Sequence, residues 1–279
     1  MPKVLSEAAV KRFRETGYHF PVRVLTATEA DGYRRHLEAY EARTGGPISG
    51  PYRHKSHLLF TWLDELVRHP TVLDLAEDVL GPNLFCWSTS FFIKEQQSGA
   101  YVSWHQDATY WGLSSPDVMT VWIAFTPANL ENGCMKFVPG THALEVVPHR
   151  DTFAKDNLLT RGQEIAVEVD EAKAVDVILE PGEASLHHVR LFHGSAPNRS
   201  PDRRIGFAIR YVPTYVRQIA GETDSATLVR GVDEHRNFEH EPRPRRDLDP
   251  EMVAFHQAIT DRQAKILYRG TGVESFRRA

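Results

Sequence analysis

The chain has 279 residues, a formal charge of -4 and 41% hydrophobic residues, which is ordinary for a globular protein with one sizeable core. The small negative charge gives no support for nucleic acid or an anionic membrane as a partner. Two cysteines are too few for a disulfide framework and favour a reducing, cytoplasmic location. No signal peptide is recognisable, and no stretch approaches the roughly 20 apolar residues of a membrane span. We therefore expect a small-molecule partner, and a homo-oligomer is neither required nor excluded.

The first 82 residues are predicted to be mainly helical. Residues 6–17 combine an N-cap serine, an apolar stripe and a closing glycine, which predicts a first helix. Thr26 and Glu29 have the spacing of a capping box and open a second helix that runs towards Arg43. Residues 57–81 predict two further helical segments, divided at Pro70 and closed by Gly81.

The composition changes at residue 83. Aromatic and small residues over 84–95 predict a strand, and further strands with turns between them are predicted at 101–106, 120–126, 135–138, 164–169, 184–186 and 204–212. Many short strands after a helical start favour a β-sandwich or barrel with helices on one face. We predict one domain over residues 1–279: a mainly helical part (1–82), a β core (83–215), and a charged surface loop with a final helix (216–279).

The stretch SWHQDATYW, Ser103–Trp111, contains the first chemically informative pattern. Residues two apart on a strand point to the same face, so His105 and Asp107 would project together and share a metal. A histidine from the later segment LHHVRLFHG would complete the facial triad of a non-haem Fe(II) oxygenase, which leaves positions open for a cosubstrate and O₂. The His-x-Asp pair alone is a weak signal, because a core histidine beside a surface aspartate is commoner.

A second pattern strengthens the metal hypothesis. Arg204 follows His193 by 11 residues and is expected on the next strand. A guanidinium there could bind a carboxylate whose other end is ligated to the same metal. This arrangement is what 2-oxoglutarate requires.

The motifs SWHQD, TVWIAFTPANLENGCMKFVPGTH and HGSAPNRSPDRR together resemble the phytanoyl-CoA dioxygenase (PhyH) family of Fe(II)/2-oxoglutarate-dependent oxygenases. The resemblance runs from the N-terminal helices to Val212. It implies a mainly β fold, a cupin-like jelly roll or double-stranded β-helix with the N-terminal and C-terminal helices packed outside. It also implies the iron ligands His105, Asp107 and His193. For 2-oxoglutarate it implies a pocket formed by Arg204, Ser195, Trp122, Thr120 and Lys94.

Three histidines, His187, His188 and His193, compete for the third ligand position. On one regular strand, His187 and His193 would share a face and His188 would point away. The motif match selects His193. His187 is then either a substrate contact or a hydrogen-bonded core histidine, and His188 is expected to be structural.

The next predicted strand offers a clue to the substrate. Arg204, Gly206, Ala208 and Arg210 should share one face, where the two small residues leave space beside the metal. Arg210 would then add a second inward cation and favour an anionic substrate group. A salt bridge at the barrel rim is the alternative.

Other residues are candidates for substrate contacts with equally ordinary alternatives. Arg53 and His57 lie in the segment YRHKSH, which could cover the site and bind an anion or be a solvated surface. Asn198 could contact the substrate or cap a turn. Tyr110 could wall the pocket or belong to the core.

The resemblance implies hydroxylation coupled to conversion of 2-oxoglutarate into succinate and CO₂. Asp107 is present where halogenating relatives have a small residue, so hydroxylation is expected. We expect a small polar, anionic substrate, because the motifs are similar to those of bacterial members that hydroxylate small compounds, including aminoalkylphosphonates. An acyl-CoA or natural-product intermediate is the alternative. Two alternatives lie outside this class. A cupin-like zinc hydrolase or isomerase would need no 2-oxoglutarate, so Ser195 and Arg204 argue against it. A non-catalytic jelly-roll binding module would have no reason to combine the His-x-Asp pair, the distal histidine and the arginine.

Overall fold

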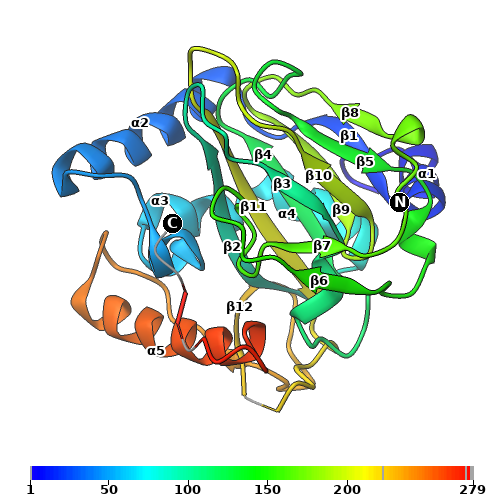
Figure 1. Ribbon diagram of the computed structural model, residues 1–279. Helices are drawn as coiled ribbons and strands as arrows, with labels where there is room; N and C mark the ends of the chain where they lie inside the picture. The colour runs from blue at the N-terminus through cyan, green and yellow to red at the C-terminus, as the bar shows by residue number, and fades with distance from the viewer. Residues whose placement is uncertain (1, 222, 274, 277–279) are drawn as a thin grey trace.

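The computed structural model describes residues 2–221, 223–273 and 275–276. Strands occupy the middle of the molecule, with α2, α3 and α5 along one side and α1 at the opposite side (Figure 1). The helices are α1 (Glu7–Thr16), α2 (Ala27–Thr44), α3 (Thr61–Val67), α4 (Pro70–Leu80) and α5 (Pro250–Leu267).

Two sheets of mostly antiparallel strands form the β core. The larger sheet has the order β1 (Tyr18–Arg23), β9 (Glu183–His188), β4 (Met119–Ala124), β11 (Arg204–Pro213), β2 (Leu84–Lys94), β12 (Ser225–Arg230) and β13 (Glu239–His240). The smaller sheet has the order β3 (Val102–His105), β10 (Phe192–Ser195), β5 (Met135–Val138) and β8 (Val175–Val177), and a separate pair consists of β6 (His149–Asp151) and β7 (Gln163–Ile165). Neighbours in space are rarely neighbours in sequence, as a jelly roll requires.

Local signals account for the helix boundaries. The Ser6 side chain accepts a hydrogen bond from the Ala9 amide at the start of α1, and Gly17 ends the helix with φ of 84°. Thr26 and Glu29 form the predicted capping box at the start of α2. Pro70 begins α4, where its missing N–H costs nothing.

Strand β11 separates the apolar core from the interior of the jelly roll. Its odd-numbered residues, including Phe207 and Tyr211, belong to the main hydrophobic cluster beneath the helices. The Phe207 ring lies 4.9 Å from that of Phe91 on β2, and the Tyr211 hydroxyl donates to the Val67 carbonyl at the end of α3. The even-numbered residues therefore face the other sheet, as predicted from the two-residue period.

The structure corrects the predicted division of the chain. Tyr18–Arg23, within the part predicted to be helical, is strand β1 and pairs with β9. Pro21 interrupts its sequence signal, as is typical of an edge strand. Strands β12 and β13 lie in the segment predicted as loop, and β12 pairs with β2. The β core therefore takes strands from beyond residues 83–215.

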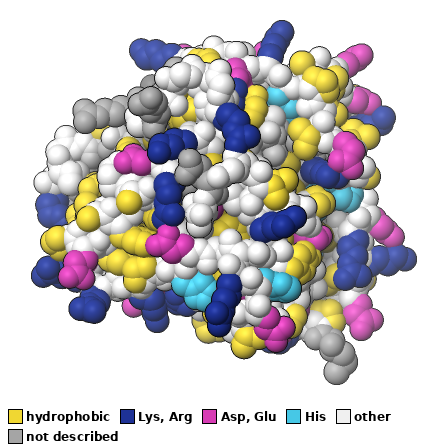
Figure 2. Space-filling model, turned by 90° about the horizontal axis from the view of Figure 1, so that it is seen from below, with side chains coloured by type: hydrophobic (Ala, Val, Ile, Leu, Met, Phe, Trp, Pro, Cys, Tyr) yellow, Lys and Arg dark blue, Asp and Glu magenta, His cyan; other side chains and the backbone are white. Residues whose placement is uncertain are grey.

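The surface is polar and mixed in charge. The face seen in Figure 2 carries Lys and Arg interspersed with Asp and Glu. In the described part of the chain, no helix has both the length and the apolar character needed to cross a membrane.

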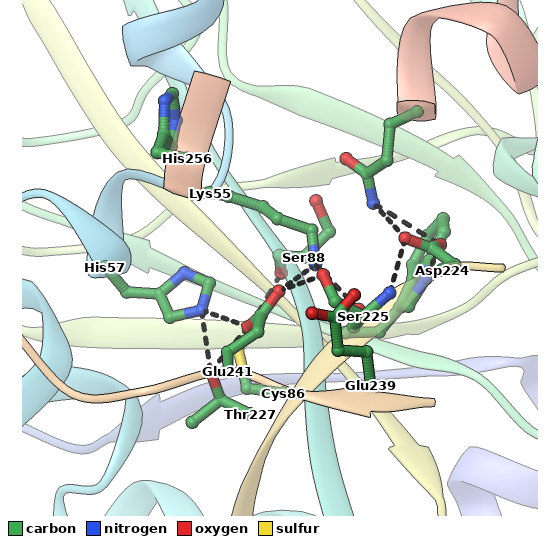
Figure 3. Close-up of polar contacts among 12 residues, drawn as sticks. Lys55, His57, Cys86, Ser88, Asp224, Ser225, Thr227, Glu239, Glu241 and His256 are labelled. Atoms are coloured by element: carbon green, nitrogen blue, oxygen red, sulfur yellow. Dashed lines mark hydrogen bonds and ion pairs between the residues drawn. The ribbon is translucent and has the colours of Figure 1, made fainter. Parts of the chain in front are cut away.

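A buried ionic cluster anchors the C-terminal third of the chain to the sheet (Figure 3). Lys55 Nζ lies 2.5 Å from Glu241 Oε1 and also donates to the Ser225 carbonyl. Glu241 Oε2 accepts from the Thr227 hydroxyl at 2.6 Å and lies 3.3 Å from His57 Nε2. The Lys55, His57 and Glu241 side chains have no solvent exposure, so Glu241, in a segment predicted as surface loop, is instead an interior ion-pair partner.

This cluster predicts a large loss of stability when its carboxylate is removed. Glu241→Gln should lower the free energy of unfolding by about 3–5 kcal/mol, because Lys55 is left buried without a counter-ion. Urea denaturation measures this change. Asp170→Asn is the control, since it removes an exposed ion pair with Lys173 and should leave the urea midpoint unchanged. Equal midpoints for both variants would contradict the assigned role of Glu241.

Candidate active site

Three potential metal ligands converge inside the jelly roll. His105 ends β3, Asp107 follows it, and His193 lies on β10 directly opposite His105 in the antiparallel pairing. All three are buried, and one ligand atom from each lies within 4.8 Å of the others. Asp107 begins a short 3-10 helix, Asp107–Tyr110. The turn after the strand, and not strand parity, therefore brings its carboxylate beside His105.

Backbone carbonyls orient the two imidazoles. His105 Nδ1 lies 2.9 Å from the Ser103 carbonyl and 3.0 Å from the His193 carbonyl, and His193 Nδ1 lies 2.9 Å from the Leu191 carbonyl. Carbonyls only accept, so each Nδ1 carries the proton and each Nε2 keeps a free lone pair. Such partners fix the tautomer and direction of a metal-binding histidine.

The protonation states also suit a metal. Burial alone would raise the pKa of Asp107, but contacts from His105 and His187 and the charge of Arg210 hold this pKa well below its usual value. Burial lowers the pKa of His193 well below that of a free imidazole. One carboxylate and two imidazoles, of which His193 is neutral, make up the donor set of non-haem Fe(II) oxygenases. The residues therefore fit an iron ion.

His187 faces the same interior for a reason that differs from the prediction. It lies on β9 in the larger sheet and His193 on β10 in the smaller, with a tight turn between them closed by Leu191 N–H donating to the His188 carbonyl. The His187 and His193 rings are 4.7 Å apart, and His187 Nε2 lies 3.7 Å from Asp107 Oδ2. The two rings meet across facing sheets and not along one strand.

Two cavities adjoin the metal ligands. The one inside the jelly roll, here called the inner cavity, is lined by His105, Asp107, His193, Trp122 and Arg204. Arg204 Nη1 donates to the Gly133 carbonyl at 2.5 Å, while its Nε has no partner in the described part of the chain. Burial lowers the pKa of Arg204 to about 10, so it remains charged at neutral pH. Its guanidinium carbon lies 5.4 Å from the Trp122 ring.

Polar side chains line or support the same cavity. Ser195 lines it and accepts a hydrogen bond from Lys94 Nζ at 2.7 Å, which leaves the Ser195 proton free to be donated. Burial and the charge of Arg204 lower the pKa of Lys94 to about 6. The Thr120 hydroxyl oxygen lies 3.4 Å from Asp107 Oδ2. A guanidinium with a free N–H and a hydroxyl beside the three donors fit a dicarboxylate such as 2-oxoglutarate.

A second cavity, called the outer cavity, adjoins the first at Phe92, Asp107 and Arg210 and continues past Trp87 and Trp111 to Asp224. Arg53 lines a neighbouring hollow that shares Phe92 and Ser90 with it, and it donates to the Phe91 carbonyl. The prediction missed Trp87 and Asp224, because neither belongs to a recognisable motif.

The structure does not bring three predicted substrate contacts to either cavity. Asn198 caps a turn, with its amide donating to the Lys94 and Glu95 carbonyls. Tyr110 donates to Asp151 at 2.7 Å. His57 belongs to the Glu241 cluster. All the polar atoms of these three side chains have structural partners, so we do not propose them for substrate binding.

The family model for phytanoyl-CoA dioxygenase (PhyH) matches residues 13–206. The chain belongs to this family. It is 33% identical over 156 residues to a probable alpha-ketoglutarate-dependent hypophosphite dioxygenase of Stutzerimonas stutzeri, a match that covers 56% of this chain and 54% of the relative. The chain spans about half the length of the curated relatives that it matches.

Solved structures extend the likeness over almost the whole chain. The non-heme monooxygenase ThoJ is 37% identical with a TM-score of 0.82, over 94% of this chain and 98% of that one. CytC3 with Fe(II) and alpha-ketoglutarate is 27% identical with a TM-score of 0.64, over 88% and 96%. The predicted jelly roll and the predicted family are confirmed, and the iron and 2-oxoglutarate expected for this chain are those named for CytC3.

The packing of Trp122 against β11 predicts that position 206 does not tolerate a side chain larger than that of glycine. A Cβ added there would lie 1.8 Å from Trp122 Cζ2, so Gly206→Ala should displace the ring and lower the free energy of unfolding by about 1–3 kcal/mol. Thermal or urea denaturation measures this. Gly32→Ala on α2 meets no atom within 4 Å, so it should be neutral or stabilising. A Gly206→Ala protein as stable as Gly32→Ala would show that Trp122 does not pack as described.

Proposed function

We propose that this protein is an Fe(II)/2-oxoglutarate-dependent dioxygenase that hydroxylates a small anionic molecule. The main observation in support is Arg210, which is buried beside the three converging metal ligands. In the described residues, no side chain or backbone group forms a hydrogen bond with it. Substrate, 2-oxoglutarate and O₂ would give hydroxylated substrate, succinate and CO₂. The bound iron and 2-oxoglutarate supply the oxidising chemistry.

The chain's own residues would bind and orient the reactants. His105, Asp107 and His193 would hold the iron, with the Nε2 atoms already directed by the carbonyls on Nδ1. Arg204 and Ser195 would hold the distal carboxylate of 2-oxoglutarate. Trp122, Thr120 and Lys94 would shape and support this pocket. His187, beside Asp107, would lie close to the bound substrate.

Arg210 supports the choice of an anionic substrate. It is buried on β11, and no described residue forms a hydrogen bond or ion pair with it. The guanidinium lies over the rings of Phe92 and Trp111, at 5.7 and 5.5 Å, and the charge of the metal ligand Asp107 also acts on it. An unpaired buried charge is costly, and burial lowers the pKa of Arg210. A substrate anion would offset this cost beside the metal, and Arg53 would add positive charge farther out.

A phosphonate is our leading candidate for that anion, and an aminoalkylphosphonate-like compound remains the preferred substrate class. A tetrahedral oxyanion suits the fork of a guanidinium. The hypophosphite named for the 33% identical relative is also a phosphorus oxyanion. A bulkier natural-product intermediate or acyl-CoA is the second candidate, because Leu158, Leu159 and Ile266 give the outer cavity an apolar wall.

Removal of the carboxylate ligand should strongly weaken iron binding. Asp107→Ala is expected to weaken Fe(II) binding by more than the roughly 10–100-fold typical of lost outer-shell partners, and succinate formation should fall to background. Anaerobic titration calorimetry and a succinate assay measure these effects. Asp176→Ala is the control, since Asp176 pairs with Lys136 on strand β5. Unchanged Fe(II) affinity in Asp107→Ala would mean that the ligand set is wrong.

Arg210 should determine the response to anionic substrates. Among small phosphonates, carboxylates and neutral analogues, anionic compounds should stimulate succinate formation. Arg210→Gln should raise the KM for the active compound by about 10–100-fold, because a charge-assisted hydrogen bond is lost. The KM for 2-oxoglutarate should not change. Arg23→Gln, which alters an exposed ion pair with Glu183, is the control. Stimulation by neutral analogues alone would refute the anionic substrate.

A further inference from the structure

The outer cavity contains a second buried ionisable group, the carboxyl group of Asp224. Asp224 directly precedes β12, has 1% of its surface exposed and lines the cavity. Its Oδ2 accepts from the Trp87 indole N–H at 2.6 Å, and its Oδ1 accepts from the Ser225 amide at 2.8 Å. Gln263 on α5 adds two long contacts of 3.4 and 3.5 Å. Every one of these donors is neutral.

Two other buried carboxylates in the described residues have cationic partners. Glu241 pairs with Lys55, and Asp64 pairs with Arg68 and Arg243. No Lys, Arg or His in the part of the chain that the structure describes lies within ion-pair distance of Asp224. An ionised carboxylate has about four lone-pair positions, and only two here are used by short hydrogen bonds. The Asp224 carboxylate group therefore has room for a further donor.

The surroundings of Asp224 suit a cation. The Trp87 and Trp111 rings lie 5.0 Å apart at 50°, and both line the outer cavity. Indole faces attract ammonium and similar cations, more strongly where water is excluded. A continuous series of contacts runs from Arg210 to Trp111, from Trp111 to Trp87, and from Trp87 to Asp224. The cavity thus has a guanidinium at the metal end and a carboxyl group at the far end.

The carboxylate is also held firmly. The next residue, Ser225, accepts hydrogen bonds from Lys55 Nζ through its carbonyl and donates from its hydroxyl to Glu241. The buried ionic cluster therefore fixes the start of β12, and with it the position of Asp224. A preorganised charged group loses little conformational entropy on binding a ligand.

We infer that Asp224, with Trp87 and Trp111, forms a subsite for a cationic group, such as an ammonium, on the substrate. This inference rests on the proposed function, in which Arg210 binds the anionic group. The substrate is then a zwitterion that spans the outer cavity, with its anionic end beside the metal and its cationic end at Asp224. The alternative is that Asp224 has a structural role, in which it accepts the hydrogen bond from Trp87 and does not bind the substrate.

Matched ligands on the Fe(II)- and 2-oxoglutarate-loaded protein test this inference. The probes are alkylphosphonates of two to four carbons, the ω-aminoalkylphosphonates of the same lengths, and propylammonium, each measured by anaerobic titration calorimetry. At one chain length or more, the amino compound should bind the unaltered protein at least about tenfold more tightly than its partner. Equal affinities at every length would overturn the cation subsite.

Variants separate charge recognition from packing. Asp224→Asn keeps an acceptor for the Trp87 indole and should remove the preference for the amino group while leaving alkylphosphonate affinity within about twofold. Asp224→Glu and Trp87→Phe should keep the preference. A preference that persists in a folded Asp224→Asn protein, or that Trp87→Phe abolishes completely, would overturn the inference. If Asp224→Asn does not fold, the comparison of paired probes on the unaltered protein decides the question.

The two proposals fail in different ways. If alkylphosphonates bind the unaltered protein but not Arg210→Gln, the proposed binding of an anionic group by Arg210 is supported, whatever the result at Asp224. Propylammonium binding that disappears in Asp224→Asn, without any alkylphosphonate binding, would support the cation subsite and refute the anionic end. Binding of none of the probes would refute both.

Discussion

The pairing of β3 with β10 is the constraint on which the site depends. It sets His105 opposite His193 across one antiparallel ladder, with ring centroids 4.0 Å apart. Backbone carbonyls occupy both Nδ1 atoms, so the ladder also decides which nitrogen of each imidazole is free. A metal site built on paired strands in this way is rigid before the metal arrives. Only the carboxylate of Asp107 comes from a turn, and the Thr120 hydroxyl on the facing strand β4 lies 3.4 Å from its Oδ2.

Strand β11 divides the site into its two functional ends. Arg204 and Arg210 share the interior face of β11 and are six residues apart. At about 3.3 Å per residue, this separation is about 20 Å along the strand. Arg204 lines only the inner cavity, whereas Arg210 lines both cavities. A cosubstrate and a substrate can therefore each have a guanidinium without competing for the same one. The opposite face of β11 packs under the helices, so one strand couples the apolar core to the placement of both charges.

The sequence predicted those features that are encoded locally. Capping residues predicted where the helices begin and end, and the two-residue period of β11 predicted its interior face. Two motifs far apart in the sequence predicted His105, Asp107 and His193 as ligands of one metal. The position of His187 was predicted for the wrong reason, because the turn that separates β9 from β10 could not be recognised from LHHVRLFHG. Strand β1 was missed because Pro21 interrupts its pattern.

Features that depend on tertiary contacts could not be predicted. Lys55 meets Glu241 from 186 residues away, and Trp87 meets Asp224 from 137 residues away. In the sequence, Glu241 lies in a charged, proline-rich segment and Asp224 in an ordinary polar one. The structure distinguishes them by their partners: the charge of Glu241 is neutralised by Lys55, whereas Asp224 contacts only neutral groups. Since a buried carboxyl group without a cationic partner is costly to ionise, its place in a cavity beside a metal site points to a ligand that supplies a positive group. The same argument applies with opposite sign to Arg210, and together the two residues define the charge pattern expected of the substrate.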